Sequence, residues 1–186
     1  MEAFTASILL VALAEIGDKT QLLSLYLAAR YRAPLSICSG IALATIANHA
    51  LAAWLGSSVA GWIEPTVLRW VLGASFLAFG FWALSADSLS TPSRLERRVV
   101  NVLLLTTIAF FLIEMGDKTQ VATVALAARY QSVWVIAAGT TIGMLIANVP
   151  AVLAGHMISD RLPVAWIRRA AAASFAIAGI AILLGY

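Results

Sequence analysis

Six long apolar stretches decide what this chain can fold into. They cover residues 4–29, 35–60, 66–86, 101–128, 133–157 and 163–185. Each is long enough to cross the hydrocarbon core of a bilayer, which takes about 20 helical residues. A segment inside lipid must satisfy its own backbone hydrogen bonds, so each stretch is expected to be a helix. The sequence therefore predicts an all-α integral membrane protein with six transmembrane helices.

The composition of the chain agrees with this prediction. Only 11% of the 186 residues are charged and 62% are hydrophobic, whereas about a quarter of a soluble domain is charged. The basic residues are scattered rather than gathered in one stripe, so we expect a lipid bilayer and no nucleic acid as partner. The single cysteine, Cys38, excludes an internal disulfide and a zinc site built from cysteines.

The two halves of the chain repeat each other at an offset of 99 residues. Between residues 13–31 and 112–130, 12 of the 19 aligned pairs are identical. A polar linker at 88–98 separates residues 1–87 from residues 99–186, and each half has three predicted spans. Because three is an odd number, the second half must enter the membrane from the opposite side. The sequence therefore predicts two inverted three-helix repeats in one membrane domain, as in many secondary transporters.

Each half carries the same charged motif in the middle of an apolar stretch. Residues 15–21 read Glu-Ile-Gly-Asp-Lys-Thr-Gln, and residues 114–120 read Glu-Met-Gly-Asp-Lys-Thr-Gln. Charges at such depth are costly and mark functional sites. In a regular helix Glu15 shares a face with Asp18, and Glu114 shares one with Asp117. Inverted repeats would bring both motifs to one point at the midplane, so these four carboxylates are the predicted metal ligands.

The chemistry of the motif indicates a hard divalent cation. Carboxylate, hydroxyl and amide oxygens suit Mg²⁺, Ca²⁺ or Mn²⁺. The same carboxylates can hold protons when no metal is bound, which is the physical basis of an antiporter. Lys19 and Lys118 are expected to be the counterions of the empty site. Weaker candidates for binding or gating are Thr20, Gln21, Thr119, Gln120, Asn48 and Asn148.

Some polar residues allow a purely structural interpretation. Asn48 and Asn148 could supply neutral oxygens to a cation or could bond between helices, and both readings stay open. His49 and His156 do not correspond in the two halves and lie outside the motifs, so we expect them to be structural. If each motif were only an internal ion pair between its glutamate and its lysine, its aspartate would have no purpose.

The basic residues also predict the orientation of the chain. Eight of them follow the first, third and fifth spans: Arg30, Arg32, Arg94, Arg97, Arg98, Arg161, Arg168 and Arg169. The opposite side has only Arg69 and Arg129. Because loops with excess Lys and Arg stay in the cytoplasm, we expect the linker 88–98 there and both termini outside.

The two motifs resemble the signature Glu-x-Gly-Asp-[Lys/Arg]-[Thr/Ser] of the Gdt-one family. This family, also called uncharacterised protein family sixteen, belongs to the lysine-exporter superfamily. The resemblance covers essentially the whole chain and implies that Glu15, Asp18, Glu114 and Asp117 form the family's cation site. It also implies transport of Mn²⁺ and of Ca²⁺ in exchange for protons. The short linker lacks the longer acidic loop of eukaryotic members, so the chain resembles the bacterial manganese exporters.

This resemblance predicts a transporter rather than an enzyme, with no cofactor beside the transported ion. The expected activity is export of Mn²⁺ across a bacterial inner membrane by alternating access, with protons as the coupling ion. A Ca²⁺/H⁺ antiporter and a passive divalent cation channel are two alternatives. An intramembrane aspartyl protease is a third, although that class is marked by Gly-x-Gly-Asp and this chain has Glu-x-Gly-Asp.

Overall fold

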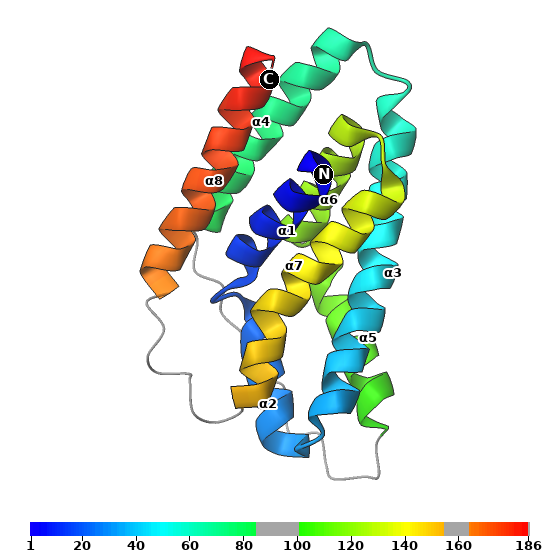
Figure 1. Ribbon diagram of the computed structural model, residues 1–186, viewed down its shortest axis with the longest axis vertical. Coiled ribbons are helices and arrows are strands. Elements are labelled where there is room, and N and C mark those ends of the chain that lie inside the picture. Colours follow the sequence, from blue (N-terminus) through cyan, green and yellow to red (C-terminus); the bar gives the residue numbers. More distant parts are fainter. Residues whose placement is uncertain (85–100, 155–163, 186) are drawn as a thin grey trace.

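Helices form all the regular structure in the part of the chain that this computed structural model describes, which is residues 1–84, 101–154 and 164–185 (Figure 1). Within these residues there are eight helices and no strand. The predicted all-α class is therefore confirmed. The predicted linker 88–98 and His156 lie outside the described residues.

The charged motif divides two of the six apolar stretches into two helices each. The first stretch forms α1 (Glu2–Glu15) and α2 (Lys19–Tyr31), and the fourth forms α5 (Val102–Glu114) and α6 (Lys118–Tyr130). The other four are the single helices α3 (Pro34–Ala60), α4 (Pro65–Ala83), α7 (Val133–Ala154) and α8 (Val164–Leu184). By position in the repeat, α1 to α4 correspond to α5 to α8.

Residues with special backbone preferences set several helix ends. Pro34 and Pro65 are the first residues of α3 and α4. Proline lacks a backbone N–H, and at the first position of a helix that group would have no partner within the helix. Arg32 and Gln131 follow α2 and α6 with the same left-handed backbone, φ 51° and ψ 36°. These two residues are 99 positions apart, so the repeat extends to the way in which the two helices end.

Equivalent helices also pack in equivalent ways. α1 lies along α7, and α5 lies along α3. A Cβ on Gly139 of α7 would lie 2.8 Å from Ser7 Cβ on α1, and a Cβ on Gly40 of α3 would lie 2.7 Å from Thr106 Cβ on α5. Both glycines thus allow a close helix approach, and both contacts recur at the same offset of 99 residues.

The remaining long helices, α4 and α8, pack against each other at one side of the bundle (Figure 1). Phe76 of α4 and Phe175 of α8 meet with their ring centroids 6.0 Å apart and their planes tilted by 58°. These phenylalanines are equivalent in the repeat, so this contact joins a residue to its own counterpart.

Two of the described helices are long and apolar enough to cross a membrane. α3 has 27 residues and α7 has 22, and an 18-residue window within each has a mean hydropathy of 1.5 and 1.8 respectively. Both present large apolar side chains outward, such as Trp54 on α3, 61% exposed, and Leu153 on α7, 70% exposed. An apolar outer face of this kind suits contact with lipid rather than water. The number of six crossings stays a prediction.

Candidate cation-binding site

The first motif breaks the helix instead of continuing it. α1 ends at Glu15, Ile16 is extended, and Gly17 has a φ of +82°. Such a φ is cheap only for glycine. Asp18 then caps α2, because its carboxylate accepts a hydrogen bond from the backbone N–H of Lys19 at 2.7 Å. The shared helix face expected for Glu15 and Asp18 is thus replaced by a turn that carries both carboxylates.

The second motif breaks its helix in the same way. α5 ends at Glu114, Met115 is extended, and Gly116 has a φ of +78°. Asp117 caps α6 by accepting a bond from the backbone N–H of Thr119 at 3.4 Å. Identical residues therefore produce nearly identical turns at two places in the chain.

Gln21 and Gln120 stabilise these turns. The side-chain oxygen of Gln21 accepts from the backbone N–H of Gly17 at 2.9 Å, and that of Gln120 accepts from Gly116 at 2.6 Å. The amide nitrogen of Gln21 also donates to the carbonyl of Ala147 on α7 at 2.9 Å. In this conformation the two glutamine oxygens are used by the backbone, so their contacts favour positioning over cation binding.

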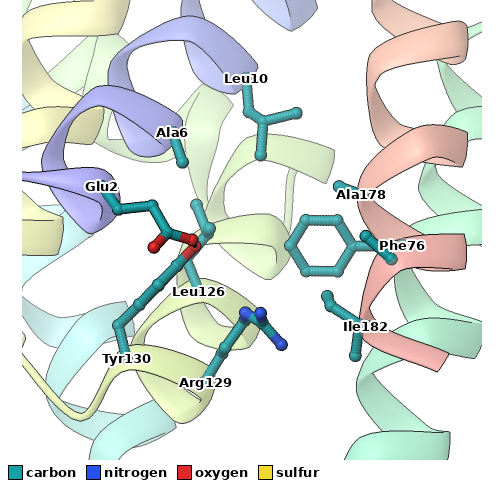
Figure 2. A pocket seen from close by; sticks show the side chains of 10 residues that line it. Glu2, Ala6, Leu10, Phe76, Leu126, Arg129, Tyr130, Ala178 and Ile182 are labelled. Carbon is teal, nitrogen blue, oxygen red and sulfur yellow. The ribbon is translucent and has the colours of Figure 1, made fainter. Parts of the chain in front are cut away.

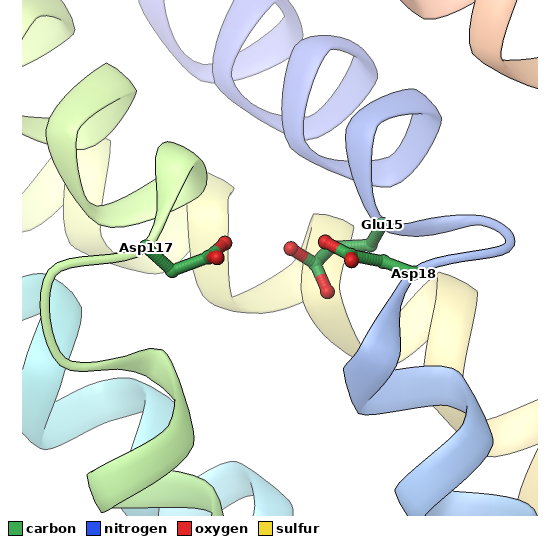
Figure 3. Close-up of side chains that lie close together, drawn as sticks. All are labelled: Glu15, Asp18 and Asp117. Carbon is green, nitrogen blue, oxygen red and sulfur yellow. The ribbon is translucent and has the colours of Figure 1, made fainter. Parts of the chain in front are cut away.

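Three carboxylates from the two turns converge (Figure 3). Glu15, Asp18 and Asp117 each offer an oxygen within 4.8 Å of the others. None of the three is more than 3% exposed. The Oε1 atom of Glu15 has no hydrogen-bond partner among the described residues. A buried cluster of oxygen donors of this kind is suited to hold a hard divalent cation.

The fourth predicted ligand lies beside this cluster rather than in it. Glu114 is 1% exposed, and neither of its carboxylate oxygens has a hydrogen-bond partner in the described part of the chain. Its Oε2 atom lies 3.7 Å from Nε2 of His49 on α3. The charges of Glu15 and Asp117 act on Glu114, so it lies in the electrostatic surroundings of the three converging carboxylates.

The two lysines connect the motifs crosswise. Lys19 of the first motif pairs with Asp117 of the second, and Lys118 of the second lies 2.8 Å from Asp18 of the first. Each ion pair is the counterpart of the other at the offset of 99 residues. The lysines therefore act as counterions of the aspartates, each for the motif to which it does not belong.

The two threonines differ in their partners. Thr20 donates from its hydroxyl to Oε2 of Glu15, and Thr119 lies 3.3 Å from Oδ2 of Asp117. The hydroxyl of Thr20 reaches Glu15 across the helix break, whereas Thr119 and Asp117 lie together at the start of α6. The site is therefore duplicated in sequence but not fully symmetric in its contacts.

The asparagines bond between helices in this structure. Asn148 accepts from Ser24 at 2.8 Å and donates to the carbonyl of Met144 at 3.1 Å. Asn48 donates to the carbonyl of Phe111 on α5 at 3.0 Å. For Asn148 these contacts favour the bonding interpretation, whereas the side-chain oxygen of Asn48 has no hydrogen-bond partner among the described residues, and both interpretations stay open for it.

Sequence reasoning missed His49, which is fully buried next to Glu114. The signal that could have found it is its place in the repeat, because residue 49 corresponds to Asn148 at the offset of 99. A polar residue at the same buried position of both halves marks the surroundings of the motifs.

A separate cavity of about 230 Å³ lies between α1, α4, α6 and α8 (Figure 2). Its wall includes Glu2, Arg129 and Phe76, and the hydroxyl of Tyr130 donates to Oε1 of Glu2 at 3.1 Å. None of the four motif carboxylates lines this cavity. The converging carboxylates therefore do not face this cavity.

A comparison with models of protein families tests the resemblance that the two acidic motifs indicate. A family model described as the divalent cation/proton antiporter GDT1 matches residues 3–91 and 102–186. The chain belongs to this family. The resemblance inferred from the two motifs is confirmed. Because the GDT1 family consists of cation transporters, the protein is a membrane transporter rather than an enzyme, and the protease alternative is wrong.

Relatives of this GDT1 protein occur in bacteria and plants. A protein of Vibrio cholerae named "Putative manganese exporter" is 50% identical over 97% of this chain and 90% of its own length. A GDT1-like protein of Synechocystis is 30% identical over 87% of each chain. A GDT1-like protein of Oryza sativa subsp. indica is 28% identical over 87% of this chain and 66% of its own. No solved structure matches the chain.

Proposed function

We propose that this protein exports Mn²⁺ from the cytoplasm in exchange for protons, through a site formed by the two helix breaks. The observation that carries the proposal is the convergence of Glu15, Asp18 and Asp117 from both halves of the chain. A cation bound there would be held by both halves at once. Manganese as the substrate is supported by the name of the Vibrio cholerae relative at 50% identity.

The charges of the site explain how metal and protons would compete. The four motif carboxylates and the two lysines together carry a formal charge of minus two. A divalent cation neutralises this charge. Without the cation, protons must do so, because uncompensated charge in a low-dielectric interior is strongly unfavourable. Metal entering from the cytoplasm would then release protons, and protons entering from outside would release the metal.

The repeat supplies the two parts that would move against each other. In this proposal residues 1–87 and 99–186 are inverted repeats of three crossings each, in a bacterial inner membrane. The pairings of α1 with α7 and of α5 with α3 support it, because each half packs its broken helix against a long helix of the other. Exchange of the two halves' conformations would open the same site first to one side and then to the other.

A carrier fits the burial of the site better than a channel does. An open pore exposes the groups that select its ions, whereas Asp18 is 2% and Asp117 is 3% exposed. A Ca²⁺/H⁺ antiporter is the second candidate. It is favoured by the oxygen-only donors of the converging carboxylates, since Ca²⁺ binds oxygen ligands.

The proposal is tested with purified protein in proteoliposomes, with a metal-sensitive dye on one side and a pH-sensitive dye on the other. We expect Mn²⁺ flux with opposing proton flux in the unmodified protein. Asp18→Asn and Asp117→Asn should reduce both fluxes to the background of empty liposomes, because each removes an oxygen donor and a charge from the cluster.

The matched control is Glu64→Gln, which removes a carboxylate from the joint between α3 and α4, where Glu64 bonds to the backbone N–H of Thr66 at 3.0 Å. It should transport at the normal rate. Normal flux in a folded Asp18→Asn/Asp117→Asn double variant would refute the site. Ca²⁺ flux that exceeds Mn²⁺ flux would favour the second candidate, and metal flux without proton flux would exclude antiport.

A further inference from the structure

His49 lies in the middle of α3 and has no exposed surface. Neither of its ring nitrogens has a hydrogen-bond partner among the described residues. Buried polar atoms without partners are rare in proteins, because such an atom loses its hydrogen bonds to water and gains none in return. The histidine therefore has an unused donor or acceptor at a place where most residues would be apolar.

The surroundings of His49 direct this unused nitrogen toward the motif. Its Nε2 atom lies 3.7 Å from Oε2 of Glu114, which is longer than a hydrogen bond. Both oxygens of Glu114 also have no hydrogen-bond partner in the described part of the chain. Metal–ligand distances of roughly 2.0–2.6 Å would let two donor atoms this far apart share one ion.

The other half of the chain shows that this arrangement is not required by the fold. Asn148 occupies the equivalent position on α7, and both ends of its amide are bonded, to Ser24 and to Met144. Glu15, the counterpart of Glu114, accepts a bond from Thr20. The unpartnered imidazole beside an unpartnered carboxylate is thus specific to one side of the site.

The chemistry of an imidazole sets it apart from the other donors of the site. Ca²⁺ and Mg²⁺ take oxygen ligands almost exclusively. First-row transition metal ions also accept an imidazole nitrogen. A single nitrogen donor next to several carboxylates therefore favours a transition metal ion over Ca²⁺ without excluding Ca²⁺ from the oxygen ligands.

We propose that His49 is a specificity-determining ligand, whose Nε2 atom binds the transported ion together with Glu114 and selects a divalent transition metal over Ca²⁺. This inference rests on the proposed cation site at the two helix breaks. It assigns to α3 a contact with the ion that neither motif contains.

The direct test is pulsed electron paramagnetic resonance of the full-length purified protein loaded with Mn²⁺. A coordinated imidazole gives ¹⁴N modulation, which changes when histidine is labelled with ¹⁵N. The chain has only two histidines, so His156→Asn serves as the matched control. We expect the modulation in the unmodified protein and in His156→Asn, and its loss in His49→Asn. Absence of the modulation from the unmodified protein, or its persistence in His49→Asn, would overturn the inference.

The second readout is the ratio of Mn²⁺ to Ca²⁺ affinity. His49→Asn copies the residue of the other half, and it should lower Mn²⁺ affinity by about 10-fold while Ca²⁺ affinity changes little. Equal loss for both ions, or no loss, would show that His49 is only structural. Asp18→Asn is measured in parallel. If Asp18→Asn still binds Mn²⁺, the proposed cation site is wrong. If Asp18→Asn loses Mn²⁺ binding but His49→Asn leaves the ratio of Mn²⁺ to Ca²⁺ affinity unchanged, only the role of His49 is wrong.

Discussion

Lys19 and Lys118 have the same neighbours in sequence but different exposure in the structure. The side chain of Lys118 is 6% exposed and that of Lys19 is 23% exposed. Each pairs with the aspartate of the other motif. An ammonium group that keeps some contact with solvent loses less when its ion pair is broken, because screening weakens the pair. The two counterions should therefore contribute unequally to stability.

We expect Lys118→Met to lower the free energy of unfolding by about 3 kcal/mol and Lys19→Met to lower it by about 1 kcal/mol, because the first removes the more deeply buried of the two ammonium groups. The measurement is chemical unfolding in detergent without added metal. Combining Lys118→Met with Asp18→Asn should recover most of the loss. Equal effects of the two single substitutions would contradict this prediction.

The sequence predicted four acidic residues for the candidate site but not their arrangement, and three of the four converge in the structure. Apolar residues continue on both sides of each motif, so periodicity gives no sign of a break, and the glycine in each motif shows only that a break would be cheap. An unbroken helix would also point Thr20 away from Glu15. The position of Glu114 beside His49 depends on how α3 packs against α5, which no pattern within a single helix contains.

At the scale of the helices, the break is controlled by a glycine. Gly17 and Gly116 have φ values of +82° and +78°, which are strained for any residue with a side chain. A Cβ on Gly116 would meet no atom within 4 Å. A substitution at Gly116 should therefore cost stability because of the backbone conformation and not because of a steric clash. The sequence predicted α3 and α4 to within a few residues because Pro34 and Pro65 mark their starts.

We expect Gly116→Ala to destabilise the protein by about 1–2 kcal/mol, because alanine disfavours the left-handed backbone. Gly61→Ala is the control, since Gly61 has a φ of −69° and a Cβ there would have its nearest neighbour 4.0 Å away. That control should leave stability unchanged within about 0.5 kcal/mol. Thermal unfolding in detergent measures both. A loss of similar size in the two variants would argue against backbone strain at the break.

At the scale of the whole molecule, the duplication is visible in residues that meet across the bundle. Phe76 packs on Phe175, its counterpart at the offset of 99 residues. The contact of Gly40 with Thr106 recurs at the same offset as the contact of Gly139 with Ser7. The sequence predicted the duplication from identities alone. It could not predict which helices would touch. A repeat shows which residues of the two halves are equivalent, but not how the two halves pack against each other.

The proposed orientation is tested by labelling single cysteines in intact cells. On a Cys38→Ser background, Trp62→Cys lies in the joint between α3 and α4, and Leu35→Cys lies near the start of α3; these side chains are 92% and 84% exposed. If the arginine-rich loops are cytoplasmic, a membrane-impermeant thiol reagent should label Trp62→Cys alone. Both should react after the membrane is permeabilised. Labelling of Leu35→Cys alone in intact cells would reverse the orientation.

The crosswise pairing of Lys19 with Asp117 and of Lys118 with Asp18 makes the halves dependent on each other. A fragment that ended at the linker would bury its aspartate without the ammonium group that pairs with it here. Two identical, oppositely oriented fragments could exchange these pairs, since each would carry both partners. Such a dimer of half-length chains would have either two histidines or two asparagines at the position that His49 and Asn148 share in the repeat. The joined chain combines His49 with Asn148, so the two sides of its one site need not be alike.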